Sequence, residues 1–176
     1  MNDDERRAII VDTTAFIVGF NVYDLHDEVY SVPDVEKELT KSSIAKLRLN
    51  TAIRAGKLKL REPSVQALNK ARKASREVGD LLSLSEADMK ILALAVQLKN
   101  EGYTPRIITD DYSIQNVAKK LAVNYASVIT YGIKFHLKWL LYCPACHRKY
   151  PPDYKFEKCE TCGTKLKRKP LSKSPA

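Results

Sequence analysis

The chain has 176 residues, and 44% of them are hydrophobic, which is enough for a buried core. The net charge of +9 is uneven, since residues 1–133 hold 19 basic and 18 acidic residues while residues 134–176 hold 11 and 3. The basic C-terminal segment predicts a polyanionic partner. Without an apolar run of roughly 20 residues or a signal-like N-terminus, we expect a cytoplasmic protein with no membrane partner.

Short apolar runs alternate with helical periodicities over the first 130 residues. Strands are expected at residues 8–11, 58–60, 106–109 and 127–130. Helices are expected from Thr13, from Pro33 toward Leu49, over Ser64–Val78, over Leu84–Asn100, and over Ile114–Leu121. This alternation predicts an α/β fold with a central parallel sheet that is covered on both faces.

Acidic residues recur where these elements begin or end. Asp12 ends the first strand, Glu36 and Asp88 lie in first turns of helices, and Asp110 and Asp111 end the strand at 106–109. The carboxyl ends of parallel strands meet at one edge of a sheet, so these carboxylates are expected to converge. Mg²⁺ and Mn²⁺ prefer such oxygen ligands. The acids therefore predict a catalytic metal site.

Each of these acids also has a purely structural explanation. Ser85 and Asp88 fit a capping-box pattern, and Asp12 and Asp111 are each suited to cap the helix that follows. Glu36 is placed to interact with a helix dipole. Taken together, however, the acids fall on the segments that are expected to meet, and this favours the metal site.

All four cysteines lie in two CxxC pairs, Cys143–Cys146 and Cys159–Cys162, with twelve residues between the pairs. Two such pairs are typical of one tetrahedral Zn²⁺ site, and a redox dithiol explains the spacing less simply. A module this small depends on its metal for folding. We expect a catalytic domain at residues 1–125, a linker and first ribbon strand at 126–140, a zinc ribbon at 141–169 and a disordered tail at 170–176.

Four segments and the attached ribbon resemble a known family. VDTTAF (11–16), SVPDVEKEL (31–39), LSEADMKILALA (84–95) and IITDDYSIQNVA (107–118) resemble the acidic signatures of PIN domains. With the ribbon, they resemble more narrowly the archaeal NOB-type endonucleases of small-subunit ribosome maturation. The resemblance implies a three-layer sandwich that cuts single-stranded precursor rRNA at the 3′ end of the small-subunit rRNA, on the assembling subunit, with Mn²⁺ or Mg²⁺.

The resemblance also implies roles for individual residues. Asp12, Glu36 and Asp88 take metal-binding positions, and Asp111 is the fourth ligand unless the adjacent Asp110 replaces it. Asp80 stands in a family-like stretch and is at most a supporting acid. The basic residues around the cysteines are expected to contact RNA phosphates: Lys134, Lys138, Arg148, Lys149, Lys165, Lys167, Arg168 and Lys169.

Three other functions are compatible with parts of the sequence. The chain could be a toxin-like PIN ribonuclease acting on tRNA or mRNA, but such proteins usually lack a zinc ribbon. It could be a non-catalytic RNA-binding assembly factor, but the near-complete set of acids argues against this. A DNA-binding role for the ribbon alone would leave the acids unexplained.

Overall fold

The computed structural model describes residues 6–39, 43–128, 135–151 and 154–175. Its strands are β1 (Arg7–Val11), β2 (Glu28–Ser31), β3 (Leu58–Leu60), β4 (Thr104–Ile108), β5 (Asn124–Ala126), β6 (Phe135–Tyr142), β7 (Lys149–Tyr150) and β8 (Lys167–Pro175). Its helices are α1 (Thr13–Val18), α2 (Pro33–Glu38), α3 (Ser43–Arg54), α4 (Val65–Val78), α5 (Glu86–Asn100) and α6 (Tyr112–Lys120), with 3-10 helices η1 (Val22–Asp24) and η3 (Leu81–Ser83). None of the helices among these residues is long and apolar enough to span a membrane.

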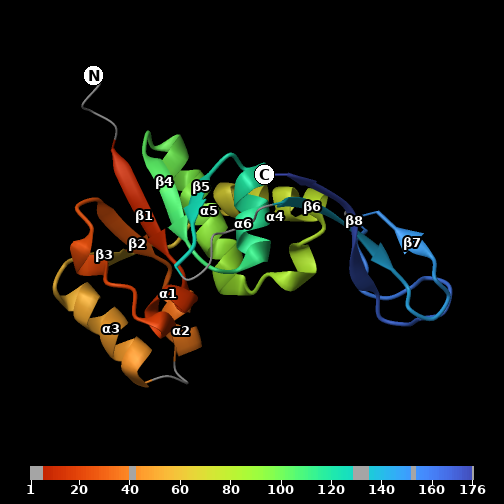
Figure 1. Cartoon of the computed structure of the whole chain (residues 1–176), viewed down its shortest axis with the longest axis horizontal. Coiled ribbons are helices and arrows are strands. Elements are labelled where there is room, and N and C mark those ends of the chain that lie inside the picture. The colour runs from red at the N-terminus through yellow and green to blue at the C-terminus, as the bar shows by residue number, and fades with distance from the viewer. Residues whose placement is uncertain (1–5, 40–42, 129–134, 152–153, 176) are drawn as a thin grey trace.

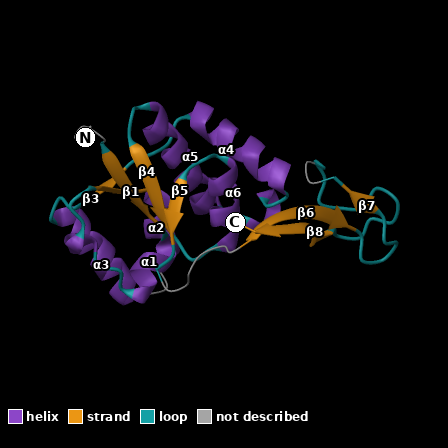
Figure 2. Cartoon of the chain, turned by 45° about the horizontal axis from the view of Figure 1, so that its top comes forward, coloured by secondary structure: helices purple, strands orange, loops and turns teal. Residues whose placement is uncertain are grey.

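The first five strands form one parallel sheet in the order β3-β2-β1-β4-β5. Helices α1 and α3 pack together on one side of it, and α4, α5 and α6 pack together on the other (Figures 1 and 2). The central strand β1 is buried from Ala8 to Val11, as expected for a parallel strand covered on both faces. The predicted three-layer α/β sandwich is therefore confirmed.

The ends of α4 and α5 follow from local capping. Ser64 caps α4 by accepting a hydrogen bond from the Ala67 amide, and Gly79 ends the helix with φ of 82°. Helix α5 begins after Ser85, whose side chain and backbone exchange hydrogen bonds with Asp88 in a capping box. These caps fix the short α4–η3–α5 connection, which borders the candidate site.

The structure differs from the sequence expectations for this part of the chain in three places. Strand β2 was not predicted, because its four residues include a glutamate and a serine, and it owes its stability to pairing on both sides with β1 and β3. The strand after α6 lies at residues 124–126, because Ala122 turns the chain with φ of 51° directly after the helix, whereas the expected strand at 127–130 lies partly outside the described residues. The helix expected from Pro33 toward Leu49 is divided into α2 and α3.

The C-terminal strands form a second, antiparallel sheet in the order β7-β6-β8. Its β6–β8 pair extends away from the α/β domain, which is formed by the parallel sheet and its helices, and ends at the cysteine turns (Figure 1). The disorder expected from residue 170 onward is contradicted, because β8 continues to Pro175. Pairing with β6 satisfies the backbone groups of this stretch, and its polar composition gave no sign of that partner.

Candidate active site

Asp12 lies at the carboxyl end of β1 and caps α1. It is only 3% exposed, and its carboxylate accepts hydrogen bonds from the Thr13 amide (2.5 Å), the Thr14 hydroxyl (2.6 Å) and the Thr109 hydroxyl (2.8 Å). Burial raises the pKa of Asp12 above its usual range, although the three donors oppose this effect. The side chain is thus rigidly oriented at the sheet edge, as a metal ligand requires.

The neighbouring acids Asp110 and Asp111 have different environments. Asp111 caps α6 by accepting a hydrogen bond from the Ser113 amide (2.6 Å). The Asp111 amide donates to the Thr109 hydroxyl, and the same hydroxyl donates to Asp12. Its charge raises the pKa of both Asp12 and Asp88, so the three carboxylates share one region. Asp110 instead accepts from the Ser127 hydroxyl and the Val128 amide. The geometry therefore favours Asp111 over Asp110 as the fourth acid.

Asp88 completes the capping box of α5, where its carboxylate accepts from the Ser85 amide (2.7 Å). Burial raises the pKa of Asp88 to about 6, and the negative charges of Asp12 and Asp111 add to the increase. The structural and functional explanations of Asp88 are thus compatible, since one carboxylate oxygen holds the helix cap while the group as a whole remains beside the other acids.

Helix α2 contributes Glu38 to this region, and not the expected Glu36. The Glu38 carboxylate accepts from the hydroxyls of Thr13 (2.7 Å) and Ser85 (2.9 Å), which are the neighbours of two candidate acids. Glu36 points elsewhere and lies 3.9 Å from the Lys46 amine. Residues two apart on a helix differ in direction by roughly 200°, so only one of them is able to face the site.

The burial pattern of α2 explains why Glu38 faces the site. Asp34 and Val35 are the buried residues of α2, and Glu38 follows them by four and three positions. It therefore shares the side of the helix that packs inward, whereas Glu36 does not.

An ion-pair network fixes α2 against α5. The buried Asp34 carboxylate accepts from Lys90 (2.6 Å) of α5 and from Lys37 (2.9 Å), and Lys90 also lies 2.6 Å from Glu62. The Lys90 amine holds the pKa of Asp34 below its usual range. Because α2 carries Glu38 and α5 carries Asp88, this network sets the spacing of two candidate ligands.

The four acids Asp12, Glu38, Asp88 and Asp111 fit a hard divalent cation by donor type. They offer only carboxylate oxygens, and burial together with the charges of neighbouring acids destabilises the ionised forms of Asp12 and Asp88 unless positive charge is added. Within the described part of the chain, the only group of three or more possible ligands within 4.8 Å of one another is formed by cysteines. The acids are thus more open than a closed cage, which suits Mg²⁺ because it usually keeps several waters.

The raised pKa of Asp88 predicts a pH-dependent stability in protein free of Mg²⁺ and Mn²⁺. The folded state favours the neutral acid, so this stabilisation is complete below about pH 4 and is lost as pH rises through about 6. Asp88→Asn should therefore raise the free energy of unfolding at pH 7.5 by about 1–2 kcal/mol, discounted for partial exposure, and by less at pH 5. Urea unfolding measures this difference.

The exposed Asp24 provides the control for this experiment, and Asp24→Asn should change stability equally little at both pH values. With excess manganese, the parent should become more stable to unfolding than Asp88→Asn, because only the parent retains all four carboxylates. If Asp88→Asn destabilised the protein equally at pH 5 and pH 7.5, its role would be confined to capping α5.

The four cysteines meet at the far end of the β6–β8 ribbon, where their sulfur atoms all lie within 4.8 Å of one another. The Cys143–Cys162 pair is 3.3 Å apart and the Cys146–Cys159 pair 3.5 Å. Thiolates around a tetrahedral Zn²⁺, with bonds of roughly 2.3 Å, would lie about 3.8 Å apart. The cluster therefore has the donor type and spacing of a structural metal site.

The basic residues expected to bind RNA have several different environments. Lys149 and Lys167 are exposed on β7 and β8, and Lys169 is exposed with its amine 5.1 Å from the ring centroid of Tyr142. Lys165 and Arg148 form exposed ion pairs with Glu157 and Glu160. Two others are not placed in this way, since Lys134 lies outside the described residues and Lys138 is described only by its backbone on β6.

Arg168 departs from its expected role as a phosphate contact. Its guanidinium forms an ion pair with Asp80, which is 1% exposed, and also lies 3.4 Å from the Ser113 hydroxyl of α6. Asn116 donates to the second oxygen of Asp80. A buried carboxylate requires such compensation, so Arg168 attaches the ribbon to the α/β domain. Asp80 is correspondingly a structural acid outside the candidate metal site.

Comparison with known proteins places these features in a family context. Residues 9–98 match the family model described as the PIN domain of ribonuclease. The chain is 38% identical over 160 residues to "Endoribonuclease Nob1" of Methanothermobacter thermautotrophicus, and the alignment covers 91% of each chain. It is 35% identical to the protein of the same name from Pyrococcus abyssi, with 90% of this chain and 91% of that protein aligned.

A differently named relative is also similar. "Ribonuclease VapC1" of Thermoplasma acidophilum is 31% identical over 159 residues, which are 90% of this chain and 76% of that protein. The alignment is longer than the nuclease domain and therefore includes part of the C-terminal segment. The relatives named Nob1 and the relative named VapC1 therefore both align with this chain beyond the nuclease domain, and the length of the alignment does not distinguish them. The sequence identity to the two Nob1 proteins is higher.

Proposed function

Because the chain belongs to the Nob1 endoribonucleases, a family of PIN-domain nucleases that hydrolyse RNA phosphodiester bonds, we propose that its substrate is precursor rRNA. The cut is made in single-stranded RNA at the 3′ end of the small-subunit rRNA, on the assembling subunit in the cytosol. The observation that carries the catalytic part is the convergence of Asp12, Asp88 and Asp111 with Glu38 at the carboxyl edge of the sheet.

Asp12, Glu38, Asp88 and Asp111 would hold Mn²⁺ or Mg²⁺. Such an ion would polarise the scissile phosphate and stabilise the charge that develops on the leaving oxygen. The chain itself orients these ligands: Thr14 and Thr109 hold Asp12, Ser85 holds Asp88, and the amides at the start of α6 hold Asp111. Fixed ligands reduce the reorganisation needed when the reaction occurs.

The direct test is incubation of the full chain with a small-subunit rRNA precursor fragment that contains the 3′ boundary. Cleavage should require added Mn²⁺ or Mg²⁺ and should map to one position at that boundary. A matched fragment with the boundary sequence scrambled should remain uncut. Cleavage of tRNA or mRNA in preference to the precursor would favour the toxin-like alternative, and binding without cleavage in either metal would favour a non-catalytic assembly factor.

We further propose that the cysteine cluster binds one structural Zn²⁺ and that this ion stabilises the ribbon alone. Elemental analysis should give one zinc per chain. Chelation should remove the low-temperature calorimetric transition of the ribbon and leave that of the nuclease domain, which has its own core from Ala8 to Val123. Protein without zinc, or one cooperative loss of both domains on chelation, would contradict this arrangement.

A further inference from the structure

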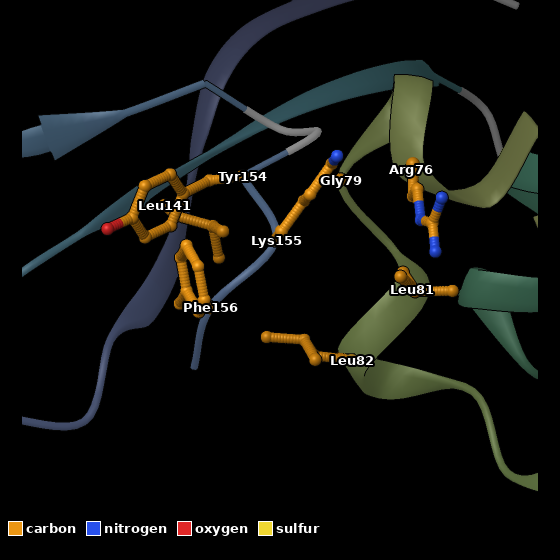
Figure 3. Close-up of a pocket in the computed structure, with 8 residues that line it drawn as sticks. All are labelled: Arg76, Gly79, Leu81, Leu82, Leu141, Tyr154, Lys155 and Phe156. Carbon is orange, nitrogen blue, oxygen red and sulfur yellow. The ribbon is translucent and has the colours of Figure 1, made fainter. Parts of the chain in front are cut away.

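An interdomain groove lies between the α4–η3 connection and the ribbon. One cavity of about 150 Å³ is lined by Arg76, Leu82 and Phe156 among others, and a second of about 210 Å³ adjoins it. Both are lined by Gly79, Leu82 and Leu141, so together they form one continuous groove. Leu82 and Phe156 approach the first cavity from opposite sides (Figure 3).

The walls of this groove are fixed relative to each other. Asp80 is the residue from which η3 begins, and its buried carboxylate binds Arg168 of β8. The ion pair therefore joins one wall directly to the other. Leu141, which is 4% exposed, forms part of the floor and also belongs to the small core of the ribbon. The groove is thus a built feature of the two-domain arrangement.

The ribbon wall presents an exposed aromatic ring. Tyr150 hydrogen-bonds Cys159 of the metal cluster and packs on Tyr154 with 4.4 Å between ring centroids. Tyr154 in turn contacts Phe156 at 5.7 Å, and Phe156 is 67% exposed. The opposite wall presents Leu82, which is 51% exposed. Two facing apolar side chains of this kind are suited to cover a flat ring.

Positive charge flanks the apolar part of the groove. Arg76 projects from α4 and Lys155 from the ribbon, and both line the first cavity (Figure 3). Neither has an acidic group within 4.0 Å among the residues that the structure describes. Lys165, which lines the second cavity, is 3.8 Å from Glu157 and its side chain is 79% exposed. The groove therefore favours an occupant that combines a planar ring with negative charge.

We propose that the interdomain groove binds one unpaired nucleotide of the RNA strand, with its base against Phe156 and Leu82 and its phosphate between Arg76 and Lys155. The first cavity is smaller than the roughly 300–1,000 Å³ of typical ligand pockets, which suits a single base better than a whole small molecule. Base stacking with flanking cations is the usual mode of single-strand recognition.

The position of the groove connects it to the acid cluster. Helix η3 forms its wall and leads directly into Ser85, which hydrogen-bonds both Asp88 and Glu38. An RNA strand that lies across the acids would thus reach Leu82 by following the same connection. This inference rests on the proposed function for the identity of the strand, but not for the presence of the groove.

Binding is best measured with the zinc-loaded full chain carrying Asp12→Asn, so that the RNA remains intact. The probe is an unstructured oligouridylate with 2-aminopurine placed at successive positions. Phe156→Ala should weaken binding roughly 5- to 150-fold, as for the loss of one base–aromatic stack, and should abolish the fluorescence change at one position. Arg76→Gln and Lys155→Gln should each reduce the steepness of the dependence of log binding constant on log salt concentration by about 0.7.

Tyr23→Ala is the matched control, since Tyr23 is an aromatic residue that is 44% exposed in η1, and RNA affinity should not change. If Phe156→Ala bound RNA with the parental affinity, at unchanged zinc content and melting temperature, the proposal would be overturned. A protein would then be the better occupant of the groove. Equal binding of an abasic strand would overturn it as well. Cleavage by Phe156→Ala without Asp12→Asn is measured separately, so failure of the groove leaves the nuclease assignment intact.

Discussion

Glu38→Gln should reduce RNA cleavage by at least 10²–10³-fold, the scale expected when a preorganised charged group is lost from an active site. Asp12→Asn and Asp88→Asn should have effects of similar size. The matched control is Glu36→Gln, two residues away on α2, which should cut at the parental rate because Glu36 faces Lys46. Cleavage is measured as single-turnover rate in saturating Mn²⁺, so that effects on RNA binding are separated from effects on chemistry.

The carboxamide variants are expected to fold, because Asn and Gln retain an oxygen that accepts the hydrogen bonds of Thr13, Thr14 or Ser85. Circular dichroism and zinc content verify this for each protein. If Glu36→Gln were inactive and Glu38→Gln fully active, the arrangement of α2 described above would not be the one that catalyses the reaction. If all four variants cut at the parental rate, the acids are not the catalytic site.

Removal of residues 134–176 should weaken RNA binding on the order of 100-fold at low salt and should flatten its salt dependence. The removed segment carries a net charge of +8, while the remaining 133 residues carry +1. Phosphate contacts release counterions, so their number sets the slope of affinity against salt. The fragment should still cut RNA slowly at high protein concentration, because its acid cluster is retained.

Truncation also removes Arg168 and leaves Asp80 buried without its cation, so the fragment differs from the full chain in stability as well as in charge. An unpaired buried carboxylate is destabilising by several kcal/mol. The fragment and the full chain should therefore both carry Asp80→Asn, and their affinities should be measured on the same rRNA fragment over a range of salt. Equal affinities and parallel slopes would show that the C-terminal segment does not hold the RNA, and would favour a protein-binding role for it.

Much of the fold could be predicted because local signals agreed with the final structure. The run at Ala8–Val11, the helix expected over Ser64–Val78 and the capping-box pattern at Ser85 each identified the correct element. Strand β2 could not be predicted in the same way, since its short sequence is a strand only because two neighbours pair with it. The same holds for β8, whose lysines and prolines resemble a disordered tail until β6 is present.

The candidate site was predictable where an acid directly follows a strand, and less so elsewhere. Asp12 and Asp111 follow β1 and β4, so their convergence at one edge follows from the topology. The choice between Glu36 and Glu38 depends on the rotation of a six-residue helix. The apolar residues Val35 and Leu39 do not decide it, because the two glutamates lie at equal angles on either side of them. The role of Arg168 was unpredictable, because composition alone does not distinguish a phosphate contact from a distant ion pair.

The pair between Arg168 and Asp80 spans 88 residues of sequence, and this separation has a consequence for biosynthesis. At roughly 5–20 residues per second, a ribosome makes Asp80 about 4–18 s before its partner. The nuclease core can assemble during that interval, but the start of η3 then holds a carboxylate whose cation does not yet exist. The emerging chain should therefore be most vulnerable to proteolysis around residues 79–83, and this vulnerability should end when β8 is made.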